Sequence, residues 1–255
     1  MKDSPRCQSE YDSRHVKAAR RVLVDLGQVL AAFRDCLVVV GGWVPDLLIS
    51  EVEEPHVGSI DVDLALDTEK LNEGRYAELL RLLLDTRRYR PGAKSFQLLT
   101  DVDLQDGTQP IQVEVEFLAS KEVNLKKNKP KLLQDFRVLQ AEGCGAAFHA
   151  PVQIELAGQT IRGASNTVQL RVASLPDFLI MKAYALAGRD KPIDAYDICY
   201  CLTHFPGGLE VLAAAWKQRS HDKDVNRAIA ILRNFQESIP AIVLRAKNIV
   251  NSGGP

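Results

Sequence analysis

The chain contains no continuous run of about 18 apolar residues, the length that a helix needs to cross a bilayer. Its polar N-terminal stretch, MKDSPRCQSEYDSRH, also lacks the apolar segment of a secretory signal, so we expect a cytoplasmic protein with no membrane partner. Neither sign of charge dominates, because 32 Lys and Arg residues stand against 33 Asp and Glu residues. This balance excludes a globally basic surface and restricts any nucleic-acid contact to local patches.

Cysteine is also scarce, since the 255 residues contain only five, an odd number, scattered along the chain. Cys199 and Cys201 form a CxC, which lacks the paired spacing of a structural zinc site. We therefore expect reduced thiols and no disulfide framework, as is usual in the cytoplasm. The remaining composition, 46% hydrophobic and 25% charged, is that of an ordinary globular protein.

The first half of the chain alternates between helical and strand periodicity. The apolar spacing predicts helices at 14–34, 43–53 and 69–89. Runs with strand character lie between and after them, at 36–42, 60–66, 93–104 and 110–119, and a hairpin turn, QDGTQ, separates the last two. This order of elements predicts an α/β (α+β) core with a mixed sheet.

The second half changes character. Two short strands are expected at 151–164 and 167–173, and the residues that follow are helical in pattern, at 175–188, 193–205, 208–220 and 222–248. We expect Ser174 to cap the first of these helices, Gly188 to end it and Pro192 to open the next. The predicted organisation is a core at 1–120, a β-rich extension of it at 121–172 and a C-terminal helical domain at 173–255.

The stretch GSIDVDLALD places two carboxylates one residue apart in an apolar strand. Side chains two residues apart in a strand share a face, so we expect Asp61 and Asp63 on one face with Ser59 and Asp67, opposite Val62, Leu64 and Leu66. Adjacent carboxylates repel each other unless a cation lies between them. Mg²⁺ prefers oxygen ligands, and these two acids are typical of half of a metal site.

The other half is expected from the strand IQVEVEFL, where Glu114 and Glu116 again share one face. We favour Glu116 as the third carboxylate because it lies toward the apolar end of the strand, while Glu114 stays open as the alternative. A second DxD, at Asp101 and Asp103, runs into the hairpin turn and has no Gly-Ser before it. We interpret that copy as solvated surface.

Small residues precede the first DxD at two places. Gly41 and Gly42 lie between a predicted strand and a predicted helix, where backbone N–H groups can receive phosphate. Gly58 and Ser59 form a second turn, whose hydroxyl can donate to a phosphate oxygen. A glycine pair, a Gly-Ser, a DxD and a later strand acid in this order favour a site for phosphate groups beside a metal.

These motifs resemble those of the nucleotidyltransferase superfamily, which has the polymerase-β-like fold. The resemblance implies that Asp61, Asp63 and Glu116 hold Mg²⁺ or Mn²⁺ as catalytic metal ligands. It also implies that the nucleoside triphosphate, ATP among the candidates, is bound by the small residues Gly41, Gly42, Gly58 and Ser59. One departure is His56, which stands near where many such sequences have an arginine before the Gly-Ser.

The helical half is similar to the AbiEii/AbiGii toxin group, on the stretch LIMKAYALAGRDKPIDAYDICYCL. The matching positions are Lys182, Arg189, Lys191, Asp194 and Asp197, with Tyr196 between the two acids. The resemblance implies that Lys182, Arg189 and Lys191 bind the triphosphate, and that Asp194 acts as general base or orients Lys182. The plain alternative is an acidic pair on a solvated helix face.

The resemblance implies an enzyme that moves a nucleoside monophosphate from a nucleoside triphosphate to an acceptor hydroxyl. In the toxin group the acceptor is often RNA, especially tRNA, or a protein side chain, and a cognate antitoxin is a possible partner. Five lysines of the loop KEVNLKKNKPK can meet a phosphate backbone, or can simply be solvated. Two other functions stay open: an antibiotic nucleotidyltransferase of the aminoglycoside or lincosamide type, and a non-catalytic nucleotide-binding interaction module.

Overall fold

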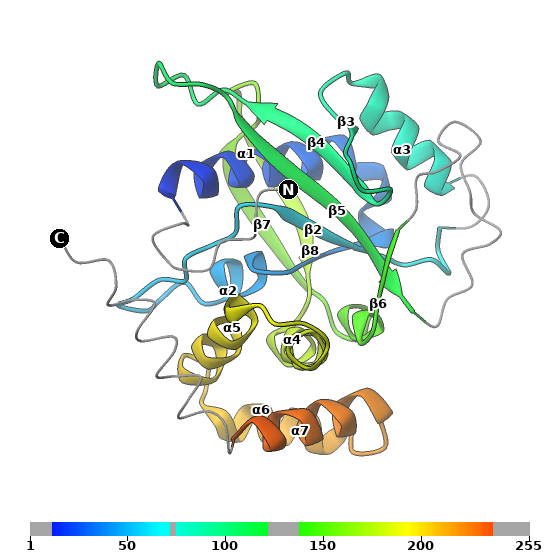
Figure 1. Ribbon diagram of the computed structural model, residues 1–255, viewed down its shortest axis with the longest axis vertical. Coiled ribbons are helices and arrows are strands. Elements are labelled where there is room, and N and C mark those ends of the chain that lie inside the picture. Colours follow the sequence, from blue (N-terminus) through cyan, green and yellow to red (C-terminus); the bar gives the residue numbers. More distant parts are fainter. Residues whose placement is uncertain (1–11, 72–74, 122–137, 237–255) are drawn as a thin grey trace.

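The computed structural model describes residues 12–71, 75–121 and 138–236. Its strands form one mixed sheet in the order β3-β4-β5-β2-β1-β8-β7, with β6 paired to β5 (Figure 1). The strands are β1 (Leu37–Val40), β2 (Val62–Leu66), β3 (Arg90–Pro91), β4 (Gln97–Val102), β5 (Ile111–Ser120), β6 (Leu139–Ala141), β7 (Val152–Gln159) and β8 (Ser165–Val172). The sheet and the helices after it confirm the predicted α/β core followed by a helical region.

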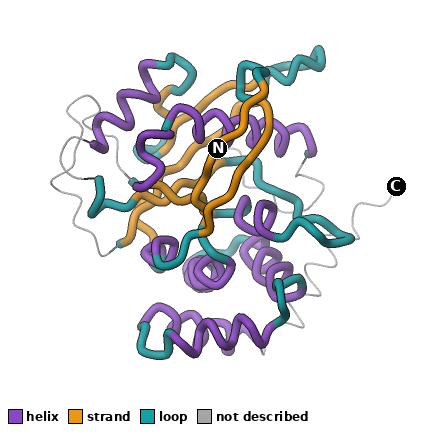
Figure 2. The backbone as a smooth tube through the Cα atoms, turned by 180° about the vertical axis from the view of Figure 1, so that it is seen from behind, coloured by secondary structure: helices purple, strands orange, loops and turns teal. Residues whose placement is uncertain are grey.

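Helices lie in two places relative to the sheet. The first group precedes or follows the central strands and comprises α1 (Ser13–Val29), η2 (Ala31–Cys36), α2 (Trp43–Leu48) and α3 (Arg75–Asp85); within it, α2 contacts β1 as well as α4 and α5. The second follows β8 and comprises α4 (Leu175–Gly188), α5 (Pro192–Thr203), α6 (Leu209–Gln218) and α7 (Lys223–Gln236). Both views show this second group as a separate layer at one end of the sheet, with η4 (Cys144–Phe148) next to α4 (Figure 2).

The centre of the sheet explains why its strands are so apolar. β1 lies between β2, which is antiparallel to it, and β8, which is parallel. β2 is in turn parallel to β5. All four residues of β1 are buried, because a central strand covered on both faces has no polar face to offer.

Two predicted elements differ from the structure in length. α2 ends at Leu48 rather than at residue 53, because the chain returns to pack His56 against the aromatic rings of α5. β2 begins at Val62, so Ser59 and Asp61 precede the strand instead of lying within it. Gly58 has φ +76° and turns the chain just before them, which an extended strand does not allow.

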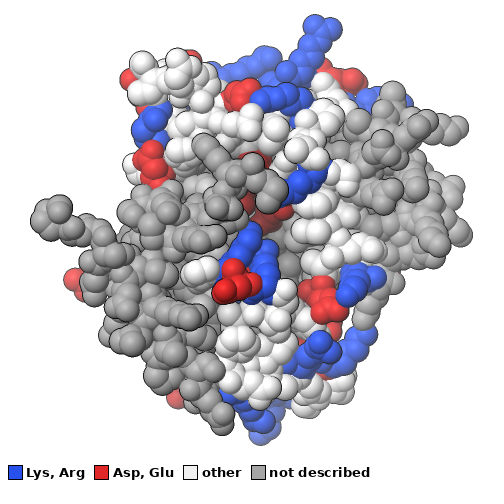
Figure 3. Space-filling view, in the orientation of Figure 1, with Lys and Arg blue, Asp and Glu red and all other residues white. Residues whose placement is uncertain are grey.

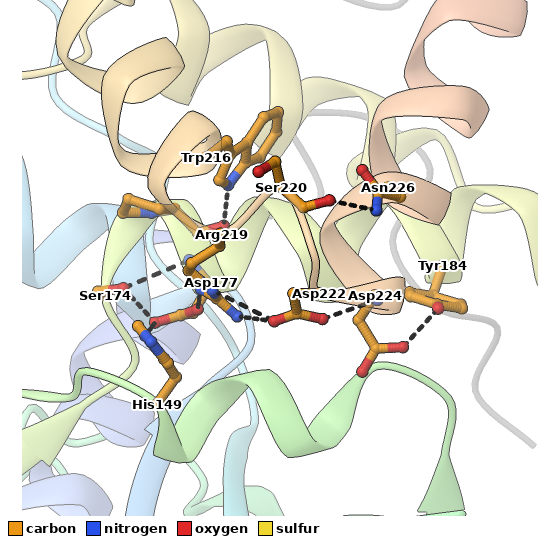
Figure 4. A network of polar contacts seen from close by, with 11 residues as sticks. His149, Ser174, Asp177, Tyr184, Trp216, Arg219, Ser220, Asp222, Asp224 and Asn226 are labelled. Atoms are coloured by element: carbon orange, nitrogen blue, oxygen red, sulfur yellow. Dashed lines mark hydrogen bonds and ion pairs between the residues drawn. The ribbon is translucent and has the colours of Figure 1, made fainter.

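The caps of the helical region follow the prediction. The Ser174 side chain accepts the backbone N–H of Asp177 at the start of α4, and α5 opens at Pro192. A network of polar contacts then fastens α6 and α7 to α4 (Figure 4). The fully buried carboxylate of Asp177 pairs with the guanidinium of Arg219, which also binds Asp222 at 2.7 Å.

Several predictions fall partly outside the described residues. Four of the five loop lysines, at 126, 127, 129 and 131 and all within KEVNLKKNKPK, lie there, while Lys121 pairs with Glu142 at 2.9 Å. The four cysteines in the described ranges are free, as expected for reduced thiols. In those same ranges, every helix is too short or too polar to cross a membrane. The proposed domain boundaries stay a prediction, although β7 and β8 belong to the same sheet as the core.

Candidate active site

Four carboxylates, which we call the strand acids, come from β2, from the residue just before it and from β5: Asp61, Asp63, Glu114 and Glu116. The parallel pairing of β2 with β5 places Asp63 directly opposite Glu116. The Glu116 side chain is 15% exposed, whereas that of Glu114 is 46% exposed. The register and the lower exposure both favour Glu116 as the partner of the two aspartates.

The glycine pair after β1 is shaped around one of these acids. Gly41 has φ +72°, and a Cβ atom built there would lie 2.4 Å from Oδ2 of Asp63. A Cβ atom on Gly42 would lie 3.2 Å from the carbonyl oxygen of Gly58. The pair therefore leaves room for Asp63 on one side and for the Gly-Ser turn on the other.

The Gly58–Ser59 turn is joined to the first aspartate. The Ser59 hydroxyl donates to Oδ1 of Asp61 at 2.5 Å, and the Trp43 indole donates to the Asp61 carbonyl oxygen at 2.7 Å. Ser59 is buried, at 7% exposure. These two hydrogen bonds thus fix the backbone and the side chain of Asp61 before β2 begins, and they keep the Ser59 hydroxyl beside the Asp61 carboxylate.

Two polar side chains that the sequence pattern did not single out contact the strand acids. The Lys94 ammonium donates to Oε1 of Glu116 at 2.8 Å. The buried Gln97 amide donates to Oε2 of Glu114 at 2.6 Å and to Oε1 of Glu116 at 3.2 Å. Gln97 is the residue of β4 that pairs with Glu116 of β5, so the register of the predicted hairpin contains the information that places it.

The electrostatic state of Asp63 reflects its surroundings. Burial raises the pKa of this carboxyl well above its usual value, and the neighbouring charges of Asp61 and Glu116 raise it further. The positive charges of Lys182 and Arg189 oppose this rise without cancelling it. A divalent cation bound among these carboxylates would relieve their mutual repulsion.

Asp194 and Asp197 of α5, which we call the helix acids, have a different environment. Both side chains are fully buried, and the Lys182 ammonium lies 2.7 Å from Oδ1 of Asp194 and 2.6 Å from Oδ2 of Asp197. The Arg189 guanidinium binds both oxygens of Asp194, at 2.7 and 2.9 Å. These acids are therefore part of a buried ion network, and the alternative of a solvated acidic pair is wrong.

The pKa values of this network follow its geometry. Burial alone would raise the pKa of Asp194, but the charges of Lys182 and Arg189 hold it below the usual value. Burial likewise favours a neutral Lys182, whereas Asp197 and Asp194 together raise its pKa. Asp194 thus stays ionised and has its carboxylate oxygens occupied, an arrangement that suits the orientation of Lys182 better than the removal of a proton.

His56 connects the Gly-Ser turn to the helix acids. The Gly58 N–H donates to Nδ1 of His56 at 3.1 Å, so Nε2 carries the proton and donates to Oδ1 of Asp197 at 3.0 Å. The imidazole is completely buried and packs against Tyr196 and Tyr200, with ring centroids 5.1 and 4.9 Å away. His56 therefore supports the backbone of the turn through these two hydrogen bonds.

The remaining basic residues lie near the strand acids. Desolvation raises the pKa of both Asp63 and Glu114, and the positive charges of Arg189 and Lys191, respectively, offset part of that rise. In the space-filling view, acidic side chains lie at the centre of this face with basic ones on either side (Figure 3). A phosphate-bearing molecule that approached this face would meet positive charge around a negative centre.

The second DxD has none of this context. Asp101 pairs with Arg90 at 2.7 Å, and both side chains are almost half exposed. Oδ1 of Asp103 accepts the backbone N–H of Gln105 at 2.8 Å, in the hairpin turn. Its interpretation as solvated surface is confirmed.

The strand acids fit a divalent cation in chemistry, although they do not form a closed cage. Among residues 12–71, 75–121 and 138–236, no three His, Cys, Asp or Glu side chains are arranged as a finished metal site. Lys94 and Gln97 engage Glu116, and Ser59 engages Asp61. The all-oxygen donor set and the raised pKa of Asp63 nevertheless suit a hard cation such as Mg²⁺ or Mn²⁺.

Comparison with known proteins identifies a family and a similar solved structure. Residues 22–244 match the family model described as nucleotidyl transferase AbiEii toxin, type IV toxin–antitoxin system. No curated protein matches the chain. Among solved structures, the chain is similar to an antigenic nucleotidyltransferase-like protein from Paracoccidioides brasiliensis, with 18% identity, a TM-score of 0.47 and coverage of 90% of this chain and 92% of that one.

Proposed function

The chain belongs to the AbiEii nucleotidyltransferase toxin family, and on this basis we propose that it transfers a nucleoside monophosphate from a nucleoside triphosphate to an acceptor hydroxyl in the cytoplasm. The observation that carries the proposal is the pairing of Asp63 with Glu116 beside the Gly41 turn. This pairing concentrates acidic side chains at one point of the sheet, where desolvation and their mutual repulsion raise the pKa of Asp63. Structural acids are usually neutralised by the protein itself, so an excess of this kind supports a functional role.

The reaction requires one bond to form and one to break. The acceptor oxygen attacks the α-phosphorus, the bond from that phosphorus to the oxygen bridging to the β-phosphorus breaks, and pyrophosphate leaves with the electron pair. The hydroxyl proton passes to solvent or to a nearby base. Positioning and charge stabilisation supply most of the catalysis in phosphoryl chemistry of this kind.

Asp61, Asp63 and Glu116 are the side chains that would hold the divalent cation, Mg²⁺ or Mn²⁺. When bound, such a cation supplies Lewis acidity toward the phosphate and the acceptor oxygen. Ser59 keeps Asp61 oriented through its 2.5 Å hydrogen bond. Gly41 leaves space for the Asp63 carboxylate, which any larger residue would displace.

The basic residues around the strand acids are proposed to receive the triphosphate. Arg189 has a 46% exposed side chain, so part of its guanidinium is available while the rest binds Asp194. Lys191 is partly exposed and close enough to influence Glu114. Lys182 is buried, and its proposed contribution is a fixed positive charge beside Asp63.

We propose RNA, and tRNA in particular, as the first acceptor to test, followed by the protein itself. The family description names a type IV toxin–antitoxin system, which supports a cognate antitoxin protein as a partner. The identity of the nucleotide base is addressed by using all four triphosphates in parallel.

The test incubates the purified full chain with Mg²⁺ and each α-³²P-labelled nucleoside triphosphate, with and without total tRNA. The inactive variant is Asp61→Asn/Asp63→Asn, and the matched control is Asp101→Asn/Asp103→Asn, which alters the surface DxD in the same way. Label transferred by the wild type and the control, but not by the inactive variant, is the expected result. Equal labelling by all three proteins, or binding of no triphosphate by any of them, would contradict the proposal.

A further inference from the structure

Lys94 occupies a position that a metal-binding role for Glu116 leaves unexplained. Its ammonium lies 2.8 Å from Oε1 of Glu116 and 3.9 Å from Oε2 of Glu114. Gln97 donates to the same Glu116 oxygen at 3.2 Å. One oxygen of the third carboxylate is therefore already satisfied by the protein.

The local backbone holds Lys94 in this place. Lys94 begins a tight turn between β3 and β4, in which the Gln97 N–H donates to the Lys94 carbonyl oxygen at 3.2 Å. The next strand fixes the turn, because the Phe117 N–H donates to the Phe96 carbonyl oxygen, also at 3.2 Å. The ammonium lies 5.6 Å from the centroid of the Phe96 ring, where a cation–π contact adds to the placement.

We propose that Lys94 is a tethered counter-ion that competes with the divalent cation for Glu116. This inference rests on the proposed function, because it concerns the same strand acids. In the absence of the cation, Lys94 offsets part of the repulsion among them. Binding of the cation requires Glu116 to release the ammonium, so Lys94 weakens cation binding.

The difference in side-chain exposure explains why the Lys94 ammonium can leave its carboxylate partner and the Lys182 ammonium cannot. The Lys94 side chain is 48% exposed, whereas that of Lys182 is 10% exposed and lies between two fully buried acids. An exposed ion pair shifts an equilibrium by about fivefold at most, and water can solvate the released ammonium. Lys182 has no such exit, so only Lys94 is suited to a reversible role.

The test measures cation binding directly and needs no catalysis. The full chain, treated with EDTA and dialysed, is titrated with MnCl₂ in the absence of nucleotide, by calorimetry and by the shift in thermal midpoint. The test variant is Lys94→Met, and Lys94→Arg retains the charge. The matched control is Lys70→Met, because Lys70 pairs with Asp67 at side-chain exposures of 49% and 15%, almost the same as the 48% and 15% of Lys94 and Glu116.

The expected result is that Lys94→Met binds Mn²⁺ about two to five times more tightly than the wild type, with Lys94→Arg near the wild type and Lys70→Met unchanged. Mn²⁺ binding by Lys94→Met but not by the wild type would support the proposal equally. Unchanged or weaker binding by a folded Lys94→Met, or the same gain in Lys70→Met, would overturn it.

A further variant separates the two proposals. Suppose that the wild type binds Mn²⁺, that Asp63→Asn abolishes this binding and that Lys94→Met leaves it unchanged. The proposed role of Lys94 is then wrong, whereas the metal site of the proposed function stands. If neither the wild type nor Lys94→Met binds Mn²⁺, both proposals fail together.

Discussion

Two groups of acids lie close together in this molecule, and they differ in how their charge is balanced. The helix acids, Asp194 and Asp197, are fully buried and have the Lys182 ammonium within 2.7 Å of each carboxylate. Among the strand acids, Asp63 lies beside Asp61 and Glu116, and desolvation together with the charges of these two acids raises its pKa. The first group is complete within the protein itself, whereas the second has more negative charge than its protein neighbours offset.

The difference shows how a structural ion network can be told from a candidate catalytic one. Removing charges from water is costly, and a fold that keeps them for stability supplies partners and hydrogen bonds for each. A fold that keeps them for binding leaves part of the balance to a ligand. Sequence spacing cannot separate the two cases, since Asp194 and Asp197 are spaced as regularly as Asp61 and Asp63.

The largest effect is expected for the strand acids in catalysis. Asp63→Asn should lower nucleotide transfer by roughly 10⁴-fold, about 5.5 kcal/mol, because it removes a proposed ligand of the cation. Its free energy of unfolding in EDTA should not fall, because the substitution relieves repulsion. Transfer assays and urea denaturation measure the two effects. Retained transfer, or a large loss of stability in EDTA, would remove the contrast between the two groups.

The opposite result is expected in the helix acids. Lys182→Met should lower the free energy of unfolding by about 3–5 kcal/mol, because it leaves buried carboxylates without their cation. Lys182→Met combined with Asp197→Asn should recover part of that loss. Urea denaturation of the wild type, of Lys182→Met and of the double variant measures how much of the lost stability the second substitution recovers. A loss below about 1 kcal/mol would mean that the network is not essential to the fold.

Low pH should reduce the contribution of the helix acids to the free energy of unfolding. The pKa of Asp194 is lower in the folded protein than the ordinary value of 3.8, so its stabilisation is present above that value and is lost as the pH falls through the folded-state pKa. Asp194→Asn should therefore be about 2 kcal/mol less stable than the wild type at neutral pH, with a gap that narrows in acid. Urea midpoints measured across the pH range test this, and a gap independent of pH would count against it.

The smallest effect is expected for the surface DxD. Asp101→Asn removes an exposed pair with Arg90 and should change the free energy of unfolding by less than about 1 kcal/mol. Nucleotide transfer should stay at the wild-type level. A strong loss of transfer would show that sequence context had been misjudged and that both DxD copies contribute.

Local pattern was enough to predict much of the fold. Alternation and apolar runs located β1, β2, β4 and β5, and the cap at Ser174 marked the start of α4. The short elements β6 and η4 were not anticipated, because three to five residues carry too little periodicity. The length of α2 depends on packing against α5, which no local pattern contains.

The part of the candidate site that is local in sequence could also be predicted from pattern. The Gly-Ser turn and the adjacent aspartates are close in sequence, and strand alternation put two glutamates on one face of β5. The partners of His56 and Lys94 are set by tertiary contacts, since Asp197 lies 141 residues from His56 and Glu116 lies 22 residues from Lys94. Burial also changed one interpretation, because Asp194 and Asp197 have a helical spacing that suits either solvent or a core.

The position of β8 has a consequence for the newly synthesised chain. β1 is made early, but one of its two neighbours in the finished sheet is β8, which begins at Ser165. Until that strand has left the ribosome, the edge of β1 has no permanent partner and is exposed to mispairing or to chaperones. β2 pairs on the other side of β1, so the sheet that carries the strand acids is completed only after β8 has been made. Premature termination before β8 is therefore expected to yield aggregating fragments rather than a folded core.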